Sequence, residues 1–93
     1  MDTDKIIRRG EAADRLLKDD IVMQALGEIE ADLLTGWANT NPTDVDGREG
    51  TYRLIKALDL LQFRLESWRA QGLLEKSNAE RRLQDERGIP QVA

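Results

Sequence analysis

A repeat of apolar residues between Gly47 and Gly72 limits the possible folds of this chain more than any other feature. The apolar residues recur at alternating spacings of four and three positions: Leu54, Leu58, Leu61, Leu65 and Trp68. This spacing places all of them on one side of an α-helix, which completes a turn in about 3.6 residues. Asp46 and Glu49 have the spacing of an N-terminal capping box, and glycine commonly follows a helix end. The sequence therefore predicts a helix over residues 47–71, with the five apolar residues in a core.

A second apolar repeat predicts a partner helix over residues 20–37. Its members are also expected in the core: Val22, Leu26, Ile29, Leu33 and Trp37. Asp19 and Asp20 precede it, and aspartate is a favoured residue at helix N-termini. Between the repeats, Pro42 disfavours helix at the residue before it, which predicts a loop. Two amphipathic helices joined by a short loop favour an antiparallel hairpin.

Weaker patterns predict a smaller helix at each end of the hairpin. Alanine and leucine pairs give residues 3–18 one apolar face, but Gly10 interrupts it, and residues 1–9 are expected to fray unless a partner holds them. Ser77 and Glu80 have capping-box spacing and predict a helix over about 78–87, closed by Gly88 and Pro90. The prediction is an all-α fold in which residues 1–93 form one small domain with polar terminal arms.

The charges are divided unevenly along the chain. The net charge is −4, but residues 19–46 carry seven acidic and no basic side chains, whereas residues 47–72 carry five basic and three acidic ones. We therefore expect the acidic and basic helices to pack together. Apolar burial would supply most of the energy, because exposed ion pairs contribute only about 0–1 kcal/mol each.

The residue types present exclude most catalytic sites. The chain has no histidine and no cysteine, so it lacks the usual base for a serine nucleophile, thiol chemistry, disulfides and imidazole or thiolate metal sites. Glu28 and Asp32 stand one helical turn apart, yet an acidic face turned to solvent is the simpler interpretation. Asp44 and Asp46 resemble the middle of a calcium loop, but that frame puts Pro42 and Arg53 at ligand positions, and both are unsuitable. We therefore predict a protein without enzymatic activity, metal or cofactor.

Nucleic-acid and membrane binding are not favoured either. The net negative charge opposes contact with phosphates, and the basic residues of the long predicted helix are scattered around it: Arg53, Lys56, Arg64 and Arg69. Two aromatic residues near them leave base stacking as an alternative. No apolar run reaches the length of a membrane span, and the first residues lack an apolar signal core. We expect synthesis in the cytoplasm.

The same helix carries a second set of apolar residues outside the core repeat. On a wheel of about 100° per residue, Tyr52 and Phe63 fall opposite Leu61, and Leu60 falls about 100° from it. Residues 3–18 would cover these side chains in a three-helix bundle. Alternatively, Tyr52, Leu60 and Phe63 form a contact surface for another protein or another copy of the chain.

The order of these motifs resembles a family of proteins. The run RGEAADRLLKDDIVMQALGEIEADLLTGW, then N-P-T-D, then DGREGTYRLIKALDLLQFRLESW, is similar to small uncharacterised proteins from structural gene clusters of tailed bacteriophages. The similarity covers roughly residues 9–74 and includes no catalytic motif. It implies a virion-associated or packaging accessory protein that is present in several copies.

Three hypotheses for the function follow. The first is a helical structural protein of a phage particle or its assembly machinery, which binds itself or other phage structural proteins and enters the virion. The second is an acidic regulatory protein that inhibits a partner or mimics nucleic acid through residues 19–46. The third is a packaging adaptor that binds nucleic acid through the basic helix. Salt-dependent DNA binding would separate the third from the others, and the oligomeric state would separate the first from the second.

Overall fold

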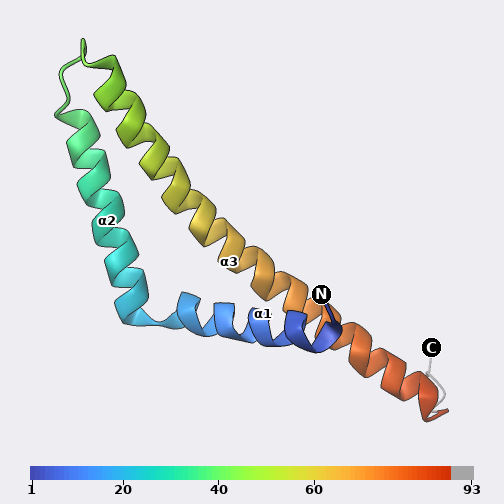
Figure 1. Ribbon diagram of the computed structural model, residues 1–93. Helices are drawn as coiled ribbons and strands as arrows, with labels where there is room; N and C mark the ends of the chain where they lie inside the picture. Colours follow the sequence, from blue (N-terminus) through green and yellow to red (C-terminus); the bar gives the residue numbers. More distant parts are fainter. Residues whose placement is uncertain (89–93) are drawn as a thin grey trace, which may run out of the picture.

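The computed structural model describes residues 1–88, which form three α-helices and no β-strand (Figure 1). They are α1 (Thr3–Lys18), α2 (Asp20–Ala38) and α3 (Val45–Glu86). The predicted all-α class is confirmed for this part of the chain. Contacts between α2 and α3 are consistent with a helical hairpin of residues 20–37 and 47–71.

The third helix runs along nearly the whole length of the molecule. α3 has 42 residues, which corresponds to a length of about 63 Å at 1.5 Å per residue. α2 leads back from the loop and diverges from α3, whereas α1 packs against the second half of α3, with an elbow between α2 and α1 at Asp19 (Figure 1). The molecule measures 68 × 26 × 25 Å and has a radius of gyration of 20.3 Å. A compact domain of this length would have a radius of gyration of only about 12 Å.

Aspartates mark the helix starts. Asp2 accepts a hydrogen bond from the backbone N–H of Lys5, and Asp19 accepts from those of Ile21 and Val22. Asp44, rather than Asp46, caps α3 by accepting from the N–H of Gly47 at 3.1 Å. The predicted capping box of Asp46 and Glu49 is therefore wrong. Asp46 lies inside the first turn, where its charge still favours the positive end of the helix dipole.

The long helix does not end at Gly72, contrary to the prediction from the sequence. It continues to Glu86, so the separate helix predicted over residues 78–87 is the last part of α3. Gly72 is buried and faces Gly10. The close approach of α1, and not the end of a helix, therefore explains why this position is a glycine. Gly88 follows the helix with a φ of 65°, a conformation that glycine tolerates best. Pro90 lies outside the described residues.

Few apolar side chains are buried in this extended shape. Within the described residues the buried ones are Ala13, Leu26 and Leu65. Leu26 and Leu65 belong to the predicted core, and four other members of it are half-buried: Val22, Leu33, Leu58 and Trp68.

The remaining four residues of the predicted core are exposed: Ile29, Trp37, Leu54 and Leu61. For α3 the reason is the rotation of the helix. The row that α3 turns towards the other helices is shifted to one side of the predicted repeat: Thr51, Ile55, Leu58, Gln62 and Leu65. The apolar face is wider than one neighbouring helix covers, and periodicity does not show which part of it a neighbour contacts.

The glycine contact gives a direct test of this packing. A Cβ atom added at Gly10 would lie 2.8 Å from both the Cα of Gly72 and the carbonyl oxygen of Trp68. Gly10→Ala should therefore lower the free energy of unfolding by about 1–3 kcal/mol, as overpacking does elsewhere. The midpoint of urea denaturation, followed by circular dichroism, measures it.

Gly27→Ala in α2 is the matched control. A Cβ atom added at Gly27 would have no atom within 4 Å, so alanine should raise stability there by about 0.5–1 kcal/mol through its higher helix propensity. Equal stabilisation by both substitutions would show that α1 does not lie against α3 at Gly10.

Candidate interaction site

The contact between α1 and α3 is built on two glycines and one arginine. Gly10 and Gly72 allow the two backbones to touch. This places Arg9 against the turn of α3 that contains Trp68 and Gln71. The guanidinium of Arg9 stacks 4.6 Å from the ring centroid of Trp68 and donates a hydrogen bond to the side-chain oxygen of Gln71 at 3.0 Å. This arrangement fixes α1 along the second half of α3. Residues 1–9 were expected to fray unless a partner holds them; here α1 begins at Thr3, and Arg9 contacts α3 of the same chain.

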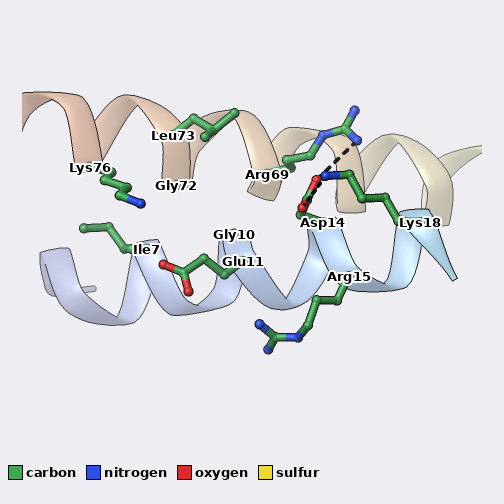
Figure 2. A pocket seen from close by; sticks show the side chains of 10 residues that line it. All are labelled: Ile7, Gly10, Glu11, Asp14, Arg15, Lys18, Arg69, Gly72, Leu73 and Lys76. Atoms are coloured by element: carbon green, nitrogen blue, oxygen red, sulfur yellow. Dashed lines mark ion pairs between the residues drawn. The ribbon is translucent and has the colours of Figure 1, made fainter.

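A groove of about 400 Å³ runs along this contact (Figure 2). Gly10 and Gly72 lie in it, and long charged side chains line it: Glu11, Asp14, Arg15, Lys18, Arg69 and Lys76. Asp14 lies 3.0 Å from the ammonium of Lys18 and 3.8 Å from the guanidinium of Arg69, so it links the two helices. Figure 2 shows Lys18 and Arg69 converging on this carboxylate from α1 and α3.

The groove is lined mainly by charged side chains. Its ionisable groups are carboxylates, guanidiniums and ammoniums, and part of that charge is already paired across the two helices. Among residues 1–88, no three carboxylates gather closely enough to hold a metal ion.

The carboxylates that the sequence singled out lie elsewhere. Asp44 caps α3, and Glu28 accepts a hydrogen bond from Gln24 one turn earlier on α2. Asp32 is exposed on α2. Among the described residues, no ion pair joins α2 to α3; the pairs are Lys18 with Asp14, Arg53 with Glu49 and Arg69 with Asp14. α2 and α3 therefore contact each other without the ion pairs expected between the acidic and basic helices.

The loop between α2 and α3 has its own small cluster of side chains. Arg48 stacks 4.4 Å from the ring centroid of Trp37 and donates a hydrogen bond to the hydroxyl of Thr40 at 3.1 Å. These contacts tie the start of α3 to the end of α2. Trp37 therefore packs with Arg48 at the loop and is not part of an enclosed core.

Tyr52, Leu60 and Phe63 lie on the outer side of α3. They are 52%, 54% and 64% exposed, respectively. α1 does not cover them, because it packs against residues 68–76 further along the helix. The three-helix bundle that would have enclosed these residues is therefore not formed. Lys56 lies 5.5 Å from the ring centroid of Tyr52 and places a cation beside this surface.

A second apolar surface was missed in the sequence because its members were assigned to the core. Leu54 and Leu61 on α3 are 58% and 48% exposed, and Ile29 on α2 is 48% exposed. We call these three residues the hairpin flank. The outer side of α3 and the hairpin flank thus both carry exposed apolar side chains.

The comparisons with known proteins give no relative. No protein family, curated protein or solved structure matches this chain. Within the described residues, no helix is both long enough and apolar enough to cross a membrane. The function must therefore be inferred from the surfaces themselves.

The absence of a carboxylate cluster in residues 1–88 leads to a prediction about metals. Calcium, magnesium or zinc should leave the thermal midpoint unchanged, because isolated exposed carboxylates bind divalent cations weakly. Differential scanning calorimetry with each metal and with a chelator measures this. A midpoint that rises saturably with one of the metals would show that the acidic residues form a site.

Proposed function

We propose that this chain is a non-enzymatic, helical protein–protein interaction module that works in several copies within a larger assembly. The observation that carries this proposal is the mismatch between its length and its core. A molecule 68 Å long has only three buried apolar side chains among its described residues, while sixteen large apolar side chains are exposed. Contact with other chains is the physical means by which such surfaces are removed from water.

The area of the molecule supports the same conclusion. Its solvent-accessible surface is 7255 Å². A compact monomer of 10.6 kDa would expose about 5,500 Å². The excess is about 1,800 Å², whereas a standard protein interface removes about 800 Å² from each partner. Each copy therefore has enough surplus surface for one or more full interfaces.

The resemblance of the sequence to proteins of tailed-phage structural gene clusters supports a role for this module in a phage particle or its assembly. We propose that it is a virion-associated or assembly accessory protein, in which the α2–α3 hairpin is a stiff antiparallel spacer. Tyr52, Leu60 and Phe63 would make contact with neighbouring protein subunits. The rigid 42-residue α3 supports a spacer role, since it presents its outer surface along nearly the whole molecule.

Phe63→Glu tests this function. Phe63 is 64% exposed, so a glutamate should leave the helical circular dichroism nearly intact. A carboxylate in a protein contact would have to lose its water, so the same change should abolish the assembly. Sedimentation velocity on the wild type and the variant measures the assembly.

Leu83→Glu is a suitable control, because Leu83 is 50% exposed on the same helix and lies far from Phe63 along it. Loss of helix in Phe63→Glu at unchanged subunit number would contradict the proposal, because it would place Phe63 in the fold of the single chain.

A further inference from the structure

We propose that the hairpin flank, formed by Ile29, Leu54 and Leu61, binds a second copy of this chain, with α2 of each copy lying against α3 of the other. This inference rests on the proposed function and names a partner for one of its surfaces. Two helical hairpins that each keep one apolar flank uncovered can bury both flanks by forming a four-helix bundle.

The three residues of the hairpin flank open on the same side of the molecule. Leu54 and Leu61 are displaced by about 60–80° from the row that α3 turns towards α2, at about 100° per residue. Ile29 is displaced by about 60°, in the same rotational sense, from the row of α2 centred on the buried Leu26. α2 and α3 run in opposite directions (Figure 1), so equal senses of rotation lead to the same flank. Ala25 and Ala57 extend it with small, exposed side chains.

The charges select the orientation of the second copy. α2 carries four acidic and no basic residues, whereas residues 47–72 of α3 carry five basic and three acidic ones. If two copies met with α2 against α2, like charges would face each other, which is destabilising. A twofold axis parallel to the helices instead places the acidic α2 of one copy beside the basic α3 of the other. In this orientation the acidic side chains of α2 can form ion pairs with basic side chains of α3 in the other copy. Within residues 1–88 of one chain, no ion pair joins α2 to α3.

The same symmetry fixes which residues meet. Trp37 of α2 lies level with Arg48 of α3, because the two side chains stack. Both helices rise by about 1.5 Å per residue, so Ile29 is level with about residue 56 of α3. Rotation about a twofold axis parallel to the helices leaves the position of each residue along that axis unchanged. Ile29 of one copy therefore lies between Leu54 and Leu61 of the other, the arrangement of a knob packed into a hole.

Substitution of the flank tests the interface. The double variant Leu54→Gln/Leu61→Gln keeps good helix formers at exposed positions, so its circular dichroism should remain helical. The dissociation constant of the dimer should rise about a hundredfold or more, as for central apolar contacts in other interfaces. The matched control is Leu74→Gln/Leu83→Gln, two exposed leucines of α3 beyond the hairpin, which should leave the constant within about threefold. Sedimentation equilibrium gives both values.

Disulfide formation tests the orientation, because the natural chain has no cysteine. One preparation carries Ile29→Cys and another carries Ala57→Cys. Mixed and oxidised, they should form a crosslinked heterodimer, while each alone should stay largely uncrosslinked. Efficient crosslinking of either variant with itself would overturn the proposed pairing of α2 with α3.

The outcomes separate this inference from the proposed function. If Leu54→Gln/Leu61→Gln leaves the assembly intact while Phe63→Glu dissociates it, the flank inference is wrong and the proposed function stands. If the flank variant dissociates the dimer and Phe63→Glu has no effect, the flank is the interface and the outer surface of α3 is not. A wild-type chain that remains a monomer at about millimolar concentration overturns both.

Discussion

The contact of two backbones at Gly10 and Gly72 determines the rest of this structure. Without a side chain on either residue, α1 approaches α3 closely enough for Arg9 to stack on Trp68 and for Asp14 to pair with Arg69. α1 is thereby held on the second half of α3. The loop, fastened by Arg48 on Trp37, holds the far end of α2. α2 thus spans the distance between two fixed points, and the elbow at Asp19 follows from that.

This arrangement fixes the helices without enclosing a core. α1 and α2 follow one another along α3 instead of packing around it, so each section of α3 has one neighbour on one side. A helix whose apolar face is wider than a single neighbour leaves a row of leucines in water, as Leu54 and Leu61 show. In the association proposed above, the hydrophobic effect would favour burial of this row, and the acidic α2 and basic α3 would direct which surfaces meet. Stability and the proposed assembly would then depend on the same burial.

Local signals in the sequence predicted the helices well, since their causes lie within a few residues. The apolar repeats and the aspartate before α2 place the ends of α1 and α2 within about two residues. Gly72 was misread because a glycine can end a helix or allow a close approach. The choice depends on Gly10, which is distant in the sequence. Likewise, the spacing of Leu54 and Leu61 shows an apolar face, but only the position of α2 decides which row of that face is covered. Periodicity placed Tyr52, Leu60 and Phe63 outside the core repeat, but their exposure and the charged groove both depend on where α1 packs on α3.

The central claim is that this chain associates through its exposed apolar surfaces and that this association adds to the stability of the folded chain. The most direct measurement is the thermal midpoint as a function of protein concentration, with the mass determined in parallel by sedimentation equilibrium. The structure predicts a midpoint that rises with concentration and a mass that is a multiple of 10.6 kDa, because mass action favours an oligomer that alone buries the apolar flank. A midpoint independent of concentration, with a mass of 10.6 kDa throughout, would contradict the claim.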